Sequence, residues 1–293
     1  MADTAGQADI RGIDIDKLAK GFADEELVLK KYVTNSTTSA REIRWYQKTS
    51  GFLDSTDTTG ITASQIANVA EGTLPFVVQQ SWTRNTSYVR KYFVESPWIS
   101  DEDIKDSDID VLTTNVRDLT RAVGYQVEAR IWDVLTESRT VVNINTNATT
   151  AAWDAASGQD PIEDIMEAKM NIREDGYNPE GGVLAINPYD YKSLVTWLIS
   201  TKGSSIPGFS SARIEDGVVM ELLGLKVVVS TIVTTDYALV FVPQRAATWK
   251  AFTPITARVI EEVGIGKKIR IWEEGEAILT DPKACNLITN TKT

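Results

Sequence analysis

One unbroken apolar repeat constrains the fold of this chain more than any other feature. Between residues 109 and 135, apolar side chains recur every three or four positions, which is the spacing of one buried helix face. The repeating residues are Ile109, Leu112, Val116, Leu119, Val123, Val127, Ile131 and Leu135. The pattern predicts a helix over residues 107–137, which at about 1.5 Å per residue spans roughly 45 Å. Such a helix is longer than a compact domain of this size needs.

The remaining elements indicate an α+β fold. Two helix starts carry an N-cap residue followed by a first-position proline, Asp160 with Pro161 and Asn187 with Pro188. The predicted elements are helices over residues 160–176 and 188–199, strands over 183–186, 225–230 and 238–243, and long alternating strands from about 247 to the end. Helices in the middle and long strands at the end favour α+β over a doubly wound enzyme fold.

The N-terminal third is less regular. A helix is predicted over residues 16–32, and its narrow apolar face suggests that it packs on another element. Residues 49–82 are rich in Thr, Ser, Gly and Gln, and they are too many for a structureless loop in a compact domain. Six carboxylates among residues 101–110 lack the spacing of a calcium loop and instead suit the N-terminus of the long helix.

Composition excludes several classes of chemistry. The chain has no histidine, which removes the commonest general base and zinc ligand, and its one cysteine, Cys285, is expected to be a small apolar strand residue. A net charge of -11 argues against a nucleic-acid reader. Residues 101–244 carry eleven basic and twenty-three acidic side chains, so both ends of the chain are near neutral. No run of eighteen apolar residues and no hydrophobic signal core occurs, so we expect no membrane span.

No enzyme motif is present, and we therefore expect no catalytic, cofactor-binding or metal-binding residue. Gly264 and Gly266 are expected to form a tight turn between strands rather than a phosphate site. The adjacent carboxylates of Glu261–Glu262 and Glu273–Glu274 face opposite ways on a strand, which favours solvated edges over a general acid and base. An enzyme with a site at Asn187 and residues 203–211 is the weakest hypothesis, because neither a histidine nor a clear nucleophile accompanies it.

The order of these elements resembles that of the major capsid protein of tailed double-stranded DNA viruses, which has the Hong Kong 97-like fold. In that family a helix beginning near Asp-Pro is followed by a Gly, a Pro and a buried strand that ends in Asn-Pro, then Tyr and Leu. The matching residues here are Asp160, Pro161, Gly176, Pro179, Asn187, Pro188, Tyr191 and Leu194, with Pro282 before the last strand. The resemblance covers residues 40–293, and its weight rests on order and spacing together.

The resemblance implies a division of the chain into the regions of that fold. They are an N-terminal arm (1–48), an extended E-loop (49–98), a peripheral domain with the long spine helix (99–149), an axial domain (150–244), long peripheral strands (245–280) and a final axial strand (281–293). In this interpretation the polar excursion gains its contacts by lying over a neighbouring subunit. The loop over residues 200–212 is expected to point toward a capsomer's symmetry axis.

The function implied is a structural one. The chain would self-assemble through pentamers and hexamers into an icosahedral shell around double-stranded DNA, which it contacts without sequence specificity. Portal, scaffold and possibly decoration proteins would be its other partners, and the virion, assembled in the host cytoplasm, its location. Because the chain begins with Met1, no scaffolding segment is expected to have been removed from it.

Some relatives crosslink an E-loop lysine to an asparagine of the next subunit. No lysine lies between Lys48 and Lys91 here, so we expect a shell without isopeptide bonds. The alternative within the same fold is an encapsulin, a cellular nanocompartment that binds cargo peptides on its inner side. The arm of about fifty residues that precedes the polar excursion favours the virus.

Overall fold

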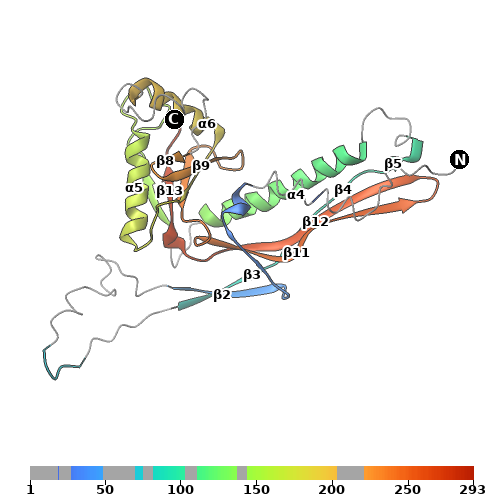
Figure 1. The fold of residues 1–293 in the computed structure, drawn as a ribbon, viewed down its shortest axis with the longest axis horizontal. Helices are drawn as coiled ribbons and strands as arrows, with labels where there is room; N and C mark the ends of the chain where they lie inside the picture. Colours follow the sequence, from blue (N-terminus) through green and yellow to red (C-terminus); the bar gives the residue numbers. More distant parts are fainter. Residues whose placement is uncertain are drawn as a thin grey trace.

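The computed structural model describes residues 19, 28–48, 70–74, 82–102, 111–136, 144–202 and 221–293. These residues form a long sheet backed by one long helix, a compact sheet with two helices, and a two-stranded hairpin that projects away from both (Figure 1). The arrangement is elongated, and it confirms the predicted α+β class.

The long helix α4 (Val111–Thr136) packs along one face of the long sheet. That sheet runs in the order β1 (Thr34–Thr37), β11 (Ala247–Glu262), β12 (Gly266–Leu279) and β4 (Arg90–Glu95), and β5 (Ile99–Ser100) pairs with the start of β12. The predicted repeat is the buried face, where Val116, Val127 and Ile131 are fully inaccessible. Burial of each such side chain contributes about 1.5–3 kcal/mol. The helix prediction is confirmed over residues 111–136, and its ends lie outside the described residues.

The two longest strands are joined by a tight turn at residues 263–265. Pairing between β11 and β12 extends to Glu262 and Gly266, with Gly264 at φ 82° and Gly266 at φ 145°. Both angles lie where side chains other than glycine are strained. The prediction that these glycines make a turn is therefore confirmed.

The central strands of the compact sheet are buried on both faces. Its order is β6 (Asn145–Ala148), β13 (Cys285–Thr289), β10 (Tyr237–Phe241), β7 (Val183–Ile186), β9 (Leu225–Val229) and β8 (Glu221–Leu222). Leu184 and Ile186 point into the core beneath the two shorter helices, whereas Val183 and Ala185 join the core at the end of α4. Because both faces of these strands are covered, β7 and β10 consist almost entirely of apolar residues.

Both predicted helix caps are formed. Helix α5 (Pro161–Glu174) begins after Asp160, whose Oδ1 accepts a hydrogen bond from the Glu163 amide at 3.2 Å. Helix α6 (Pro188–Trp197) begins after Asn187 and continues as a π-helical turn, Leu198–Lys202. Residues 203–220 lie outside the described residues, which includes most of the loop expected to point toward a symmetry axis.

The projecting hairpin pairs β2 (Glu42–Lys48) with β3 (Trp82–Tyr88). The sequence placed the excursion at residues 49–98, but strand pairing begins at Glu42, and β4 returns to the long sheet directly after Tyr88. The described strands of the hairpin are therefore Glu42–Lys48 and Trp82–Tyr88, and residues 49–69 and 75–81 between them lie outside the described residues.

Little of the predicted helix over residues 16–32 can be compared. Ala19 is helical and buried, and Leu29–Lys31 form a single 3-10 turn. The other residues before Val28 lie outside the described part of the chain.

Candidate assembly site

Three carboxylates of β12 are buried where the N-terminal segment, the hairpin base, β4 and α4 meet. We call Glu273, Glu274 and Glu276 the carboxylate junction; they are 0%, 6% and 1% exposed. The expectation that Glu273 and Glu274 form a solvated edge is wrong. They do face opposite ways on the strand, but both faces of β12 are covered at this point by other segments.

Glu273 ties the N-terminal segment to the long sheet. Its Oε1 atom forms an ion pair with Lys30 and accepts a hydrogen bond from the Trp249 indole N–H at 3.2 Å. The Lys30 ammonium also lies 5.4 Å from the centre of the Trp249 ring, within the range of a cation–π interaction. The 3-10 turn Leu29–Lys31, just before β1, is thus fixed to the middle of the sheet by charge as well as by packing.

Glu274 fixes the base of the hairpin. Its Oε2 lies 3.2 Å from a guanidinium nitrogen of Arg41, the residue before β2, and its Oε1 lies 3.7 Å from the Lys91 ammonium. Arg41 also stands 4.8 Å from the centre of the Phe252 ring. The strand that enters the hairpin and the strand that leaves it toward the sheet are therefore held by the same carboxylate.

Glu276 connects α4 with the start of β4. Its Oε1 accepts hydrogen bonds from Arg130 of α4, at 2.8 Å from Nε and 2.6 Å from a terminal nitrogen. Its Oε2 lies 3.2 Å from Nε of Arg90 at the start of β4. Burial raises the pKa of the neighbouring Tyr92 phenol to about 12, and the Glu276 charge acts in the same direction.

A fourth buried carboxylate, Glu128 of α4, holds the N-terminal segment from the other side. It accepts hydrogen bonds from the amides of Val28 and Leu29, the latter at 2.6 Å. Burial raises the pKa of Glu128, and these amides act in the opposite direction. The segment that leads into β1 is thus held at both ends of one short turn.

The hairpin itself exposes an aromatic and basic face. Cross-strand pairing puts Tyr46 opposite Arg84, and Tyr88 opposite Glu42, on one face. On this face Tyr46, Trp82 and Tyr88 are 62%, 56% and 67% exposed. A two-stranded hairpin is marginally stable alone in water, and large exposed rings are typical of contact surfaces. This geometry suits a hairpin whose exposed aromatic face becomes buried against another protein surface.

The strand–helix corner at Asn187 does not present a free site. The Asn187 side chain accepts from the Tyr189 amide at 3.0 Å and donates to the Val233 carbonyl at 2.6 Å. Its polar atoms are engaged inside the protein, and residues 203–211 of the enzyme hypothesis lie outside the described residues. The corner shapes the compact domain.

Two further expectations concern reactive groups. Cys285 is fully buried in β13, as predicted for an apolar strand residue, and burial raises the pKa of its thiol. Within the described ranges, no three His, Cys, Asp or Glu residues are placed to share a metal ion. No helix in that part of the chain is long and apolar enough to cross a membrane.

Comparison with solved structures identifies the fold. The capsid of the cyanophage P-SCSP1u aligns with a TM-score of 0.65 at 16% identity, covering 90% of this chain and 88% of that one. The capsid of an empty GTA particle gives a TM-score of 0.67 at 11% identity, covering 91% and 90%. A virus-like particle from Pyrococcus furiosus gives a TM-score of 0.61 at 11% identity, covering 94% and 98%. The chain thus has the Hong Kong 97-like fold of capsid shell proteins.

The family follows from the sequence itself. The model of the family described as phage capsid protein matches residues 98–285, more than half of the chain, and the protein belongs to that family. A comparison with curated proteins gave no match. The predicted resemblance is confirmed, and the protein is a capsid shell protein.

Sequence reasoning missed the carboxylate junction. The amino-acid sequence of β12 contains three acidic residues within four positions, but it does not indicate which segments cover the strand. The available signal was a set of basic residues that flank the two hairpin strands, at Arg41 before β2 and at Arg90 and Lys91 after β3.

Proposed function

We infer that this protein is the major capsid protein of a tailed virus, and that its copies assemble through pentamers and hexamers into an icosahedral shell around double-stranded DNA. The observation that carries this proposal is the hairpin, which leaves the body at a charged junction and exposes Tyr46, Trp82 and Tyr88. A surface of this kind is stabilised when another copy covers it. Portal, scaffold and possibly decoration proteins are its proposed partners, and the virion, assembled in the host cytoplasm, its proposed location.

The regions of the subunit follow from the same proposal. Residues 1–48 serve as the arm and residues 49–98 as the E-loop, which is entered through strand β2 (Glu42–Lys48) at the end of the arm and left through β3 (Trp82–Tyr88) and β4 (Arg90–Glu95). The long sheet with α4 is the peripheral domain, and the compact sheet with its two helices is the axial domain. The protein acts as a structural component rather than as an enzyme.

The proposed shell has no isopeptide bonds between subunits. The sequence has no lysine between Lys48 and Lys91, and Lys91 is engaged with Glu274 and with the Phe93 ring, 4.9 Å from the ring centre. Boiled particles should therefore run as a single band of 32.3 kDa on a denaturing gel. A covalent ladder would refute this part of the proposal.

Negative-stain electron microscopy of the purified chain tests assembly. Shells with fivefold and sixfold capsomers are expected, and a persistent monomer at high concentration would refute the proposal. Nuclease treatment followed by phenol extraction then tests the contents of particles from infected or induced cells. Protected double-stranded DNA is the expected result.

An encapsulin-type compartment is the second candidate, since it shares the fold. The virus-like particle from Pyrococcus furiosus covers 94% of this chain, which supports a shell protein. This match does not distinguish a shell that contains DNA from one that contains protein cargo. The match to the phage capsid family favours the virus. Particles that contain a folded protein cargo and no protected DNA would favour the compartment.

A further inference from the structure

The buried side chain of Asp190 lacks the hydrogen bonds that a carboxylate normally requires. Asp190 stands in the first turn of α6 and is 0% exposed. The Asp236 amide and the Thr291 hydroxyl face its carboxylate, but within the described part of the chain neither completes a hydrogen bond of normal geometry. A buried carboxylate in this state is stable with a proton and costly with a charge.

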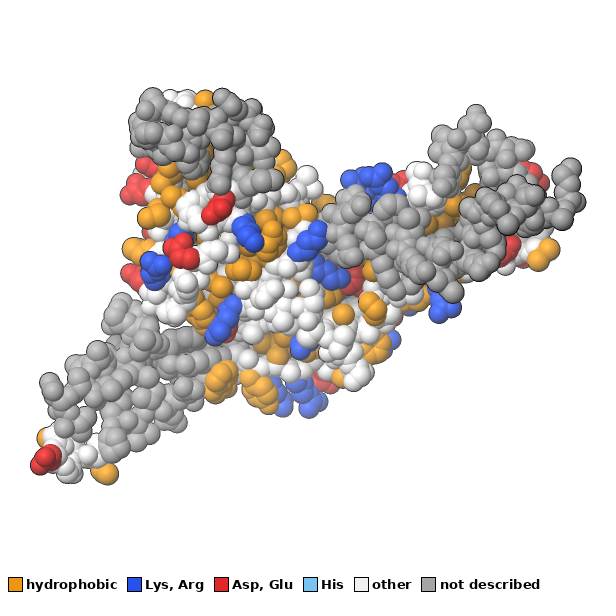
Figure 2. Space-filling view, in the orientation of Figure 1, with side chains coloured by type: hydrophobic (Ala, Val, Ile, Leu, Met, Phe, Trp, Pro, Cys, Tyr) orange, Lys and Arg blue, Asp and Glu red, His pale blue; other side chains and the backbone are white. Residues whose placement is uncertain are grey.

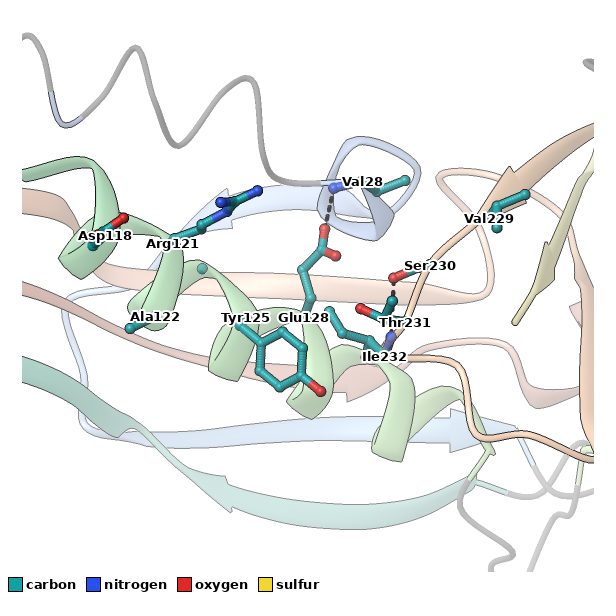
Figure 3. Close-up of a pocket in the computed structure, with 11 residues that line it drawn as sticks. Val28, Asp118, Arg121, Ala122, Tyr125, Glu128, Val229, Ser230, Thr231 and Ile232 are labelled. Carbon is teal, nitrogen blue, oxygen red and sulfur yellow. Dashed lines mark hydrogen bonds between the residues drawn. The ribbon is translucent and has the colours of Figure 1, made fainter. Parts of the chain in front are cut away.

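Glu128 of α4 provides the contrast, because it is a buried carboxylate that has its donors. It is 2% exposed, and Figure 3 shows its carboxylate directed at the Val28 amide. The Leu29 amide donates a second hydrogen bond, at 2.6 Å. Among the described residues, Asp190 has no comparable pair of donors. Its ionisation is therefore compensated far less by the surrounding protein.

One side of the Asp190 site is closed by residues Asn290–Thr293, which we call the latch segment. The segment follows β13 and turns at Asn290, whose φ of 63° lies in the left-handed region that asparagine tolerates. Thr291 is 0% exposed, and its carbonyl accepts a hydrogen bond from the Trp153 amide at 2.9 Å. Figure 1 shows this end of the chain beside α6.

The latch segment is held in place by two other aspartates. The Lys292 amide donates to Oδ1 of Asp236 at 3.0 Å, and the Thr293 amide donates to Oδ1 of Asp154 at 2.9 Å. Asp154 also accepts a hydrogen bond from the Tyr189 hydroxyl at 3.1 Å. Burial acts against it, but these hydrogen bonds keep the pKa of Asp154 below its ordinary value. Asp154 is therefore charged at any pH near neutrality.

The ionisable groups that face Asp190 from neighbouring segments are both acids. Burial raises the pKa of Asp190 from 3.8 to about 6. The negative charges of Asp236 and Asp154 act in the same direction, whereas the Asp236 amide and the Thr291 hydroxyl act against them. The carboxylates that hold the latch segment are thus the ones that disfavour a charge on Asp190.

The wider surroundings do not supply a compensating positive charge at this point. Lys292 is the only base of the latch segment, and its ammonium lies over the Tyr189 ring, 4.6 Å from the ring centre. Residues 101–244 carry twenty-three acidic and eleven basic side chains, and Figure 2 shows acidic side chains over the surface of the compact domain. The summed field of the domain therefore opposes a further buried negative charge.

We propose that the latch segment is a proton-controlled latch, which is closed over Asp190 while that carboxyl group is protonated and is released when it ionises. The protonated group can donate to the Thr291 hydroxyl oxygen, and it does not repel Asp154 and Asp236. Ionisation adds a third negative charge, and release of the segment lets water solvate it. The device belongs to the single subunit, and it goes beyond the proposed shell function without depending on it.

Hydrogen exchange measured by mass spectrometry tests the latch on the full, unassembled chain. The test variant is Asp190→Asn, because an amide fills nearly the same space and cannot ionise. The measured quantity is the exchange rate of residues 290–293 in the wild type divided by the rate in the variant at the same pH, which cancels the intrinsic pH dependence of exchange. The pKa of Asp190 is about 6 when covered and near 3.8 when solvated. We therefore expect this ratio to rise about tenfold between pH 5 and 7 and to level off by pH 8.

Two further variants separate titration of Asp190 from general loosening. Asp154→Asn keeps an oxygen for the Thr293 amide but removes a negative charge, so its transition, measured against Asp154→Asn with Asp190→Asn, should move to lower pH. Glu261→Gln alters a carboxylate on the long sheet that is 64% exposed, and it should leave the wild-type profile unchanged. Peptides from β7 and β10 should stay protected throughout.

Three results would overturn the latch. The wild type and Asp190→Asn could exchange in parallel from pH 5 to 8, which would mean that ionisation does not release the segment. The transition could stay in place in Asp154→Asn, which would mean that another group titrates. Strand β7 could lose protection together with the latch segment, which would mean that the whole domain opens.

Discussion

Replacing Glu276 by leucine tests the carboxylate junction most directly. The substitution removes the partner of Arg130, whose guanidinium is only 19% exposed, and it leaves that charge beneath the long sheet. Removing one member of a buried ion pair typically costs 3–5 kcal/mol. Arg90, the second partner, is 57% exposed and can be solvated, so the lower end of that range applies. We expect the free energy of unfolding to fall by about 3 kcal/mol.

The assay is urea unfolding of the unassembled chain, followed by tryptophan fluorescence. Arg130→Met is the reciprocal substitution and should cost a similar amount, because it leaves Glu276 buried. The double variant should cost about 2 kcal/mol less than the sum, since a buried pair replaced by apolar side chains loses its desolvation penalty as well.

Glu261→Leu on the neighbouring strand is the matched control. Glu261 is 64% exposed and lies 3.7 Å from the Lys267 ammonium, so its loss should change stability by less than about 0.5 kcal/mol. The reasoning would be refuted if Glu276→Leu and Glu261→Leu were equally mild. It would also fail if the two substitutions at Glu276 and Arg130 were additive.

Three further substitutions examine other parts of the fold. Burial raises the pKa of Asp190 to about 6 from 3.8, so the folded state binds its proton more tightly and stability should fall as pH rises from about 4 to 6. Asp190→Asn should therefore be more stable than the wild type at pH 7, by up to about 3 kcal/mol. Melting temperatures measured from pH 4 to 8 should show that the variant lacks the fall in stability that the wild type shows between pH 4 and 6. Asn187→Ala removes the α6 cap and should cost about 1–2 kcal/mol in urea unfolding, whereas Asn187→Asp should cost less. Gly275→Ala would place a methyl carbon 2.5 Å from the Trp249 ring and should cost at least about 2 kcal/mol, with loss of near-ultraviolet dichroism; an unchanged spectrum would count against this packing.

The elements that the sequence predicted well are those whose signals are local. The spine helix follows from a repeat that one face of α4 buries, and the caps at Asp160 and Asn187 bond as expected within two or three residues. The turn at Gly264 and Gly266 is also local, because its positive φ angles depend on the glycines themselves. Each of these features is decided by residues close together in the chain.

The errors arise where distant segments meet. Glu273 and Glu274 resemble a polar edge, yet the groups that bury and neutralise them come from residues 30, 41 and 91. The strand pairing of the hairpin, from Glu42 to Tyr88, also depends on distant segments. No local sequence signal within residues 87–96 marks the end of β3 at Tyr88. That boundary depends on the pairing of β4 with β12, which lies far along the sequence.

The carboxylate junction and the absence of a loop lysine bear on one physical problem. A hairpin that leaves the body has no core of its own, so its direction must be set at its base. Lys30, Arg41 and Arg130 bring three separate segments to one strand, and a buried ion pair is sensitive to geometry in a way that apolar packing is not. In the proposed shell, such a base would fix the direction in which the hairpin reaches a neighbour before any contact forms. Less conformational entropy would then be lost on assembly, which would strengthen the proposed contact without a covalent bond.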